Sequence, residues 1–278
     1  MHLIPFEIIL VFVSVFAGLI GSLIGIGGGI IITPFLVLAF GIDIRYAMGA
    51  ALTSVIATSS GAAAAYIRDG ISNMKLGMFL SIATTVGALC GASLALYLDQ
   101  NILLIVFGAA LLISAILSFL KKNQQPQNIQ SSNLANKLQL PGNYKIKDKT
   151  VHYAVQGVVP GFIVMNIAGF LSGLLGIGSG AFKVLGMDFL MKLPFKVTTA
   201  TSNFMIGVTA AASVGIYFKS GYIDPLLAAP VALGVLVGAY FGAKILPFAP
   251  VKLLKIIFTL AIFLIGIQMI LEGFQFKI

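Results

Sequence analysis

Residues 17 to 29 read AGLIGSLIGIGGG, and residues 168 to 180 read AGFLSGLLGIGSG, 151 positions further along the chain. Each stretch comes directly before a short apolar segment. Their glycine-rich ends are named here the first break (Gly25 to Gly29) and the second break (Gly176 to Gly180). A run of glycines interrupts a helix, because each glycine stabilises it about 1 kcal/mol less than alanine does. The near-copies therefore predict two homologous halves, each with an interrupted helix.

Other landmarks recur after the breaks in the same order. The matched pairs are LTSVIATSS from Leu52 with ATSNFMIGV from Ala200, AYIRDG to Gly70 with IYFKSG to Gly221, and Gly87 and Gly91 with Gly234 and Gly238. A shared order of this kind is hard to ascribe to low complexity. It predicts a duplicated unit of five segments.

The composition is that of a membrane protein. Of 278 residues, 59% are hydrophobic and 9% are charged, and the mean hydropathy is +1.07, whereas a soluble domain carries about 25% charged residues. Most of the surface must therefore face a lipid bilayer. The net charge of +9 does not indicate nucleic acid, because six of the seventeen cations lie in one polar stretch. Membrane orientation explains that distribution better.

The apolar runs define the expected helices. They cover residues 5 to 24, 29 to 40, 46 to 67, 74 to 98, 102 to 120, 153 to 175, 181 to 193, 197 to 218, 223 to 246 and 251 to 271. A helix needs about 20 residues to cross the hydrocarbon core, so all can span except 29 to 40 and 181 to 193. The sequence predicts an all-α polytopic membrane protein with two homologous repeats of about five helical segments, each containing one glycine-rich broken or re-entrant segment.

The polar stretch 121 to 150 separates a first repeat, 1 to 120, from a second, 151 to 278. It holds six lysines against Asp148 and has no apolar period that would pack on another element. We expect a mobile, basic linker on the cytoplasmic side. A role in binding phospholipid or docking a partner is left open.

The cations favour inverted repeats. With the linker in the cytoplasm, an odd number of crossings per half places thirteen of the seventeen Lys and Arg residues inside, and an even number places ten there. Cytoplasmic segments are enriched in Lys and Arg. The odd number is preferred, and it implies inverted halves with both termini outside.

The two breaks are the predicted centre of the functional site. Paired interruptions in two repeats point to a transporter's binding site, because irregular backbone at membrane depth survives only in protein or beside a polar cavity. A helix that starts after each break would direct free N–H groups and its positive dipole end at an anion. Close helix packing or ordinary turns are the alternative. The predicted substrate-binding residues of the breaks are Gly25, Gly27, Gly28, Gly29, Gly176, Gly178, Ser179 and Gly180.

Polar side chains near the breaks complete the predicted site. Lys183 lies in an apolar region three residues after Gly180, and a charge buried in a membrane is by default functional; the alternative is that it snorkels to an interface. Asp188 is a candidate partner of Lys183 or a candidate carrier of a coupling proton. Side chains that can donate to an oxyanion, or else bond back to their own helix, are Thr53, Ser54, Thr201, Ser202 and Asn203.

We expect no catalytic residues, no metal site and no cofactor. Cys90 and two histidines cannot form a cluster with zinc-site spacing, and the scattered acids provide no nucleophile with a base. The GIGGG motif lacks the strand and the acidic partner of a dinucleotide site, and the chain has no GxxxxGK[ST] motif for ATP. An enzyme is not expected.

The first break is followed by Ile30 to Thr33 and Pro34, and its second copy stands at Gly176 to Gly180. With the duplication and the chain length, these residues resemble the sulfite exporter TauE/SafE family, also called the toluene sulfonate uptake permease family, over both halves. The resemblance implies bacterial inner-membrane carriers of small sulfur-containing or organic anions, including sulfite and sulfonates. The second half departs from the pattern, because Ser179 replaces a glycine and Leu185 answers to Pro34. These departures lie where selectivity would be set.

We therefore expect a secondary transporter that exposes a small anion alternately to each side of the membrane and is driven by a gradient. The alternatives are a passive anion channel, which would show no saturation and no counterflow, and a non-transport membrane scaffold. Whether the chain forms a homo-oligomer is left open.

Overall fold

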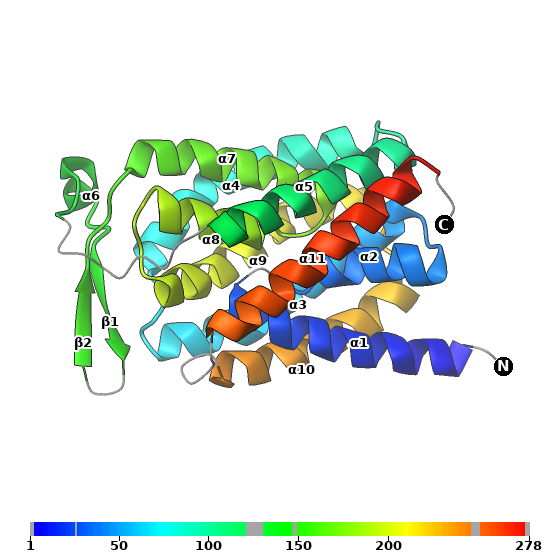
Figure 1. Ribbon diagram of the computed structural model, residues 1–278, viewed down its shortest axis with the longest axis horizontal. Helices are drawn as coiled ribbons and strands as arrows, with labels where there is room; N and C mark the ends of the chain where they lie inside the picture. Colours follow the sequence, from blue (N-terminus) through cyan, green and yellow to red (C-terminus); the bar gives the residue numbers. More distant parts are fainter. Residues whose placement is uncertain (1–2, 26, 121–129, 147–148, 246–250, 276–278) are drawn as a thin grey trace.

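The computed structural model describes the chain except residues 1–2, 26, 121–129, 147–148, 246–250 and 276–278. Most of it is helical (Figure 1). The elements in order are α1 (Leu3–Ile24), α2 (Gly29–Phe40), α3 (Ile44–Arg68), α4 (Met74–Ala95), α5 (Gln100–Leu120), α6 (Asn133–Lys137), β1 (Gly142–Ile146), β2 (Lys149–Tyr153), α7 (Val158–Leu175), α8 (Gly180–Phe189), α9 (Phe195–Lys219), α10 (Pro225–Ile245) and α11 (Val251–Gly273). The predicted all-α polytopic membrane fold is confirmed.

The two halves share one pattern of helix lengths. Both α1 to α5 and α7 to α11 consist of a long helix, a short helix and three long helices, and the short ones, α2 and α8, have 12 and 10 residues. In the parts of the chain whose side chains are described, six helices are long and apolar enough to cross a membrane: α1, α3, α4, α7, α9 and α10. The other two segments expected to span, α5 and α11, have 21 and 23 residues.

Each half packs its first helix on the fourth helix of the other half. Helix α1 lies along α10, and α7 lies along α4. Glycines allow this close approach: a Cβ on Gly238 would overlap the Val15 carbonyl oxygen, and a Cβ on Gly87 would overlap that of Asn166. Both pairs are related by the 151-residue offset, so the same interface occurs twice.

The constant offset corrects two of the sequence pairings. Gly87 answers to Gly238, not to Gly234, because these two glycines make the equivalent contacts. By the same offset, Ser54 is equivalent to Met205. The Ser54 carbonyl accepts a hydrogen bond from Thr58, and the Met205 carbonyl accepts the equivalent bond from Thr209. Small residues recur every four positions in these helices, so a shift of about one turn still aligns similar letters.

Helices α3 and α9 pack against each other at the centre and run antiparallel. Gly49, near the start of α3, lies against Tyr222, just after α9. Ser59, further along α3, lies against Phe204 and Gly207 near the middle of α9. The equivalent first helices α1 and α7 likewise enter the helical body from opposite ends (Figure 1). An inverted arrangement in the membrane remains a prediction, and this antiparallel packing is its structural basis.

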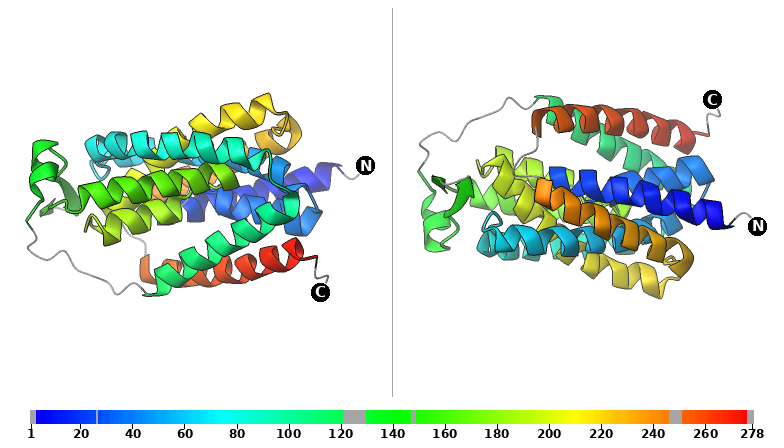
Figure 2. Two further views of the ribbon diagram at one scale, coloured as in Figure 1. Left: turned by 90° about the horizontal axis from the view of Figure 1, so that it is seen from above. Right: turned by 90° about the horizontal axis from the view of Figure 1, so that it is seen from below.

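The fifth helices of the halves form a pair of their own. In Figure 2, α5 and α11 lie together at one side of the body. They are also antiparallel, because Gly108 lies against Gly266 and Gly273 lies against Asn101. The pairing again joins equivalent elements of the two halves.

The expectation of a mobile linker without packed elements is wrong for the residues from 133 to 153 that the structure describes. They form α6 and an antiparallel hairpin in which Gly142 pairs with Tyr153 and Ile146 with Lys149. This unit, named here the cap module (α6, β1 and β2), covers the end of the body opposite the N- and C-termini (Figures 1 and 2). Residues 121–129 and 147–148 lie outside the described residues.

A small apolar core holds the cap module in place. Ala135, Leu140, Tyr144 and Tyr153 are buried in one cluster with side chains of α4 and α8, among them Leu76 and Met187. These apolar residues are spaced without helical or strand periodicity in the sequence. Their partners lie on distant helices, so a reading of the linker alone does not reveal the core.

Asn73 links the cap module to the transmembrane helices. Its side-chain amide donates to the Leu140 carbonyl at 2.7 Å and to the Tyr153 hydroxyl at 2.9 Å, and its Oδ1 accepts from the Leu76 N–H and so caps α4. Its backbone N–H donates to Thr201 Oγ1 at 3.0 Å. Burial raises the pKa of the Tyr153 phenol and so favours its neutral form, whose oxygen accepts the bond from the Asn73 amide. One residue thus joins the cap module, α4 and α9.

We predict that Gly238→Ala and Gly87→Ala each lower the free energy of unfolding by about 1–3 kcal/mol, because the added Cβ overlaps backbone of the facing helix. The matched control is Gly215→Ala, where a Cβ would have no heavy atom within 4 Å and where alanine is the better helix former. The measurement is the melting temperature of the purified protein in detergent. If all three variants melt like wild type, the two interfaces are not packed as described.

We also predict that Asn73→Asp loosens the cap module without removing the α4 cap. An aspartate keeps the Oδ1 acceptor for the Leu76 N–H but has no amide to donate to Leu140 and Tyr153. Cleavage by trypsin after the exposed Lys137 should become roughly tenfold faster, as expected for lost hydrogen bonds at a partly buried contact. Asn143→Asp, on the exposed part of β1, is the control. Cleavage at the wild-type rate in both variants would contradict the link.

Candidate functional site

The two breaks meet at the centre of the helical body. Helix α1 ends at Ile24 and α2 begins at Gly29, while α7 ends at Leu175 and α8 begins at Gly180. A Cβ on Gly29 would lie 3.3 Å from the Gly176 carbonyl oxygen. Val55 of α3 and Ile206 of α9, which the 151-residue offset relates, both contact Gly27 and Gly178. The structure therefore brings the predicted glycines of both halves together between α3 and α9.

Backbone conformation explains the glycines of both breaks. Gly25 and Gly27 have φ of 80° and 82°, and Gly176 and Gly178 have φ of 66° and 70°, a region that other residues rarely adopt. Close contacts add to this requirement. Gly25 lies against Thr199, and its equivalent Gly176 lies against Met48, which is the equivalent of Thr199. These four glycines are thus required by the fold whatever ligand the site binds.

Ser179 is the exception in the second break. It has φ of 44°, whereas Gly28, which answers to it in the first break, has φ of −69°. The Ser179 hydroxyl donates to the Ala168 carbonyl of α7, and that bond ties the strained residue to the preceding helix. The break that departs from the duplicated pattern in sequence also departs from it in backbone geometry.

Ser202 and Asn203 of α9 hold the end of α1. Ser202 Oγ donates to the Gly25 carbonyl at 2.8 Å, and Asn203 Nδ2 donates to the Ser22 carbonyl at 3.1 Å. Both side chains are fully buried, and both bonds cross from the second half to the first. Since the last carbonyls of a helix have no intrahelical donor, these side chains satisfy backbone that the break exposes.

The remaining predicted side chains bond elsewhere. Thr53 and Ser54 donate to the carbonyls of Ala50 and Ala51 in their own helix, both at 2.7 Å, while Thr201 accepts from Asn73. A hydroxyl has one proton, so in this conformation Thr53, Ser54 and Ser202 have none left for a ligand. Among the described residues, the donors that remain near the breaks include backbone N–H groups, Lys183 and the buried hydroxyls of Thr33 and Ser172, which have no hydrogen-bond partner.

Lys183 is the charged side chain at the breaks. Among the side chains that the structure describes, it alone is both charged and fully buried. Its Nζ donates to the Gly178 carbonyl at 2.9 Å and to Thr209 Oγ1 at 2.8 Å, so it does not snorkel to an interface. Asp188 lies near the other end of α8 and is half-buried; its role in coupling stays a prediction.

Thr58 and Thr209, which the sequence analysis missed, occupy equivalent positions beside the breaks. Thr58 Oγ1 accepts from the backbone N–H of Gly28 at 3.3 Å, and Thr209 Oγ1 accepts from Lys183. Thr209 Oγ1 also lies 3.0 Å from Thr84 Oγ1. The 151-residue offset between these two threonines is the signal in the sequence that could have identified them. It is weak, because no motif distinguishes a functional threonine from any other threonine in an apolar helix.

This arrangement has the kinds of donors that an anion site requires. Helices α2 and α8 begin at the breaks, and the first N–H groups of a helix have no intrahelical partner and lie at the positive end of its dipole. Lys183 adds a positive charge when it is protonated, and two of its three N–H donors then have the acceptors named above. The described residues contain no group of three or more His, Cys, Asp and Glu side chains that could hold a metal ion.

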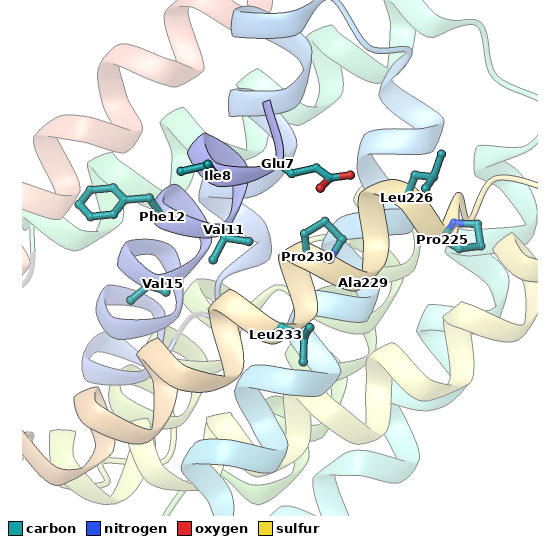
Figure 3. A pocket seen from close by; sticks show the side chains of 10 residues that line it. All are labelled: Glu7, Ile8, Val11, Phe12, Val15, Pro225, Leu226, Ala229, Pro230 and Leu233. Carbon is teal, nitrogen blue, oxygen red and sulfur yellow. The ribbon is translucent and has the colours of Figure 1, made fainter. Parts of the chain in front are cut away.

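A surface groove lies away from the breaks. It has a volume of about 700 Å³, runs between α1 and α10, and is lined mainly by apolar side chains such as Phe12 and Leu233, with Glu7 close to Pro230 (Figure 3). Phe12 and Leu233 are 73% and 65% exposed, as suits a lipid-facing surface. None of the predicted site residues lines this groove, so it is not the candidate site.

Comparisons with known proteins agree on one family. The family model described as Sulfite exporter TauE/SafE matches residues 10–269. The chain is 30% identical to the probable membrane transporter protein YunE of Bacillus subtilis, covering 96% of this chain and 98% of that one. It is 30% identical to the probable membrane transporter protein YdhB of the same organism (92% and 95%) and 26% identical to the probable membrane transporter protein MJ0441 of Methanocaldococcus jannaschii (95% and 95%). No solved structure matches the chain.

We predict that Ser202→Ala lowers the free energy of unfolding by about 1–3 kcal/mol, because the Gly25 carbonyl loses its buried donor. Ser60→Ala is the matched control, since Ser60 is exposed and bonds to the Ile56 carbonyl of its own helix. Melting temperatures in detergent compare the two. Equal melting of both variants would mean that the Ser202 bond does not hold the first break.

Proposed function

The chain belongs to the sulfite exporter TauE/SafE family and is a membrane transporter, and from that premise we propose that it is a secondary transporter of small sulfur-containing or organic anions. Sulfite and a sulfonate are the first candidates, and the bacterial inner membrane is the proposed location. The relatives are named as transporters, so no enzymatic activity is proposed.

The proposed mechanism is alternating access by two inverted repeats. The antiparallel packing of α3 on α9, which are equivalent helices, supports the inverted relation. The exchanged contacts of α1 with α10 and of α7 with α4 support a two-fold relation between the halves. One repeat moving against the other around the meeting breaks would expose the site first to one side and then to the other.

The observation that carries the anion assignment is the buried Lys183 at the second break. Its charge lies where two helices direct their N-terminal ends, and its hydrogen-bond partners, Gly178 and Thr209, are neutral. A buried charge without compensation is costly, and an anion bound between the breaks would supply the compensation. The N–H groups of the breaks and Lys183 are its proposed ligands, while Ser202 and Asn203 hold the breaks in place.

Energy for transport would come from a gradient of protons, of the anion or of the membrane potential, since the sequence has no ATP-binding motif. Asp188 is the proposed residue for ion coupling. The cap module and the basic stretch around it are proposed to lie on the cytoplasmic side, with both termini outside.

We predict that proteoliposomes preloaded with sulfite show saturable counterflow of a sulfur oxyanion, and that Lys183→Met raises the KM for that anion by roughly tenfold or more, the effect of losing a hydrogen bond from a charged donor. Sulfate, thiosulfate, a small sulfonate and a carboxylate are offered as competitors. The matched control is Lys192→Met, because Lys192 is exposed.

Three other outcomes would be decisive. Flux that neither saturates nor exchanges would indicate a channel, and no flux of any of these anions would refute the proposed substrate class. Saturable counterflow that is intact in Lys183→Met would keep the carrier and remove Lys183 from its site.

A further inference from the structure

Tyr66 and Tyr217 are a matched pair of buried tyrosines. They stand near the ends of α3 and α9 and differ by the same 151 residues as the breaks. Both have a relative exposure of 0% and are among the largest fully buried side chains of the described residues. Tyrosine in an apolar interior requires a partner for its hydroxyl.

Each hydroxyl reaches the helix that leads into the break of its own half. The Tyr66 hydroxyl donates to the Ser22 carbonyl at 2.9 Å, and the Tyr217 hydroxyl donates to the Gly173 carbonyl at 3.1 Å. Ser22 and Gly173 are again 151 residues apart, and each lies in the last turn before its helix ends. Carbonyls there have no intrahelical donor, and leaving one unsatisfied in an apolar body is costly.

We propose that Tyr66 and Tyr217 are positioning residues that fix where α1 and α7 end and thereby set the geometry of the site between the breaks. This inference rests on the proposed function for its effect on the anion. The hydrogen bonds of the two hydroxyls among the described residues do not reach the proposed anion ligands. Each acts through the carbonyl that it holds, because the position of that carbonyl determines where the following break, and the N–H groups of α2 or α8, can lie.

The two positions differ in the number of donors. The Ser22 carbonyl also accepts from Asn203 Nδ2, whereas the hydrogen bonds seen among the described residues give the Gly173 carbonyl no second side-chain donor. The residue that answers to Asn203 in the first half is Leu52, which cannot donate. Among the described residues, Tyr217 is therefore the one side-chain donor to the Gly173 carbonyl, whereas Tyr66 shares the Ser22 carbonyl with Asn203.

The first test is hydrogen–deuterium exchange of the full-length protein in lipid nanodiscs. Tyr217→Phe should speed exchange at residues 173–180 by about tenfold, as expected for one hydrogen bond to a buried carbonyl, and leave residues 22–29 unchanged. Tyr66→Phe should have a smaller effect at residues 22–29 that grows when Asn203→Leu is added. The control is Tyr97→Phe, whose ring is 85% exposed.

The second test is the counterflow assay of the same variants. Tyr217→Phe should raise the KM for the transported anion about tenfold with at most a twofold change in maximal rate, and Tyr97→Phe should match wild type. A split between KM and maximal rate separates positioning of the site from a loss of folded protein.

The outcomes distinguish this inference from the proposed function. Unchanged exchange in both tyrosine variants, or faster exchange spread over all helices, would overturn it, as would local exchange with an unaltered KM. If wild type moves no anion while exchange responds locally in each half, the proposed function fails and the role of the two hydroxyls in holding the helix ends is supported.

Discussion

The structure depends on one constraint: two helices stop in the middle of an apolar body, and the backbone groups that they expose must still form hydrogen bonds. The side chains around the breaks meet this requirement. Ser202 donates a hydrogen bond to the Gly25 carbonyl. Asn203 and Tyr66 both donate to the Ser22 carbonyl, and Tyr217 donates to the Gly173 carbonyl. All four donors come from α3 and α9, the two helices that pack against each other at the centre. Four fully buried residues with polar side chains, Tyr66, Ser202, Asn203 and Tyr217, bond to the backbone where α1 and α7 end, and the potential binding surface is built from the same interruptions.

Local patterns in the sequence were enough to predict the architecture of the halves. Run lengths and glycine content are local properties, and they identified the short α2 segment at residues 29–40 and both breaks. Relations between distant helices could not be obtained in this way. The exchange of α1 and α7 between halves is invisible in one sequence, and glycines spaced by four residues allowed Gly87 to be paired one turn away from its true equivalent, Gly238.

The cap module and the site show why composition is an incomplete guide. Residues 133 to 153 looked like a linker because their few apolar side chains have no period, yet Leu140, Tyr144 and Tyr153 find partners on α4 and α8. At the site, the glycines and Lys183 were placed correctly beside one another, but the roles of the hydroxyls were not foreseeable. Whether a serine in a helix bonds to its own turn, as Ser54 does, or to a break in the other half, as Ser202 does, is decided by tertiary packing.

The cap module covers one end of a body that is otherwise built from two equivalent halves (Figures 1 and 2). In a transporter with two identical halves, exchanging the conformations of the halves would produce a second state, open to the other side of the membrane, with the same energy. Here the contacts of Asn73 with Leu140, Tyr153 and Thr201 have no counterpart around Asp224, the equivalent residue, whose described bond is to the Leu226 N–H. Under the proposed alternating access, the two facing states of this chain would therefore differ in energy. In that mechanism the cap module would favour one resting orientation before any gradient acts on the protein.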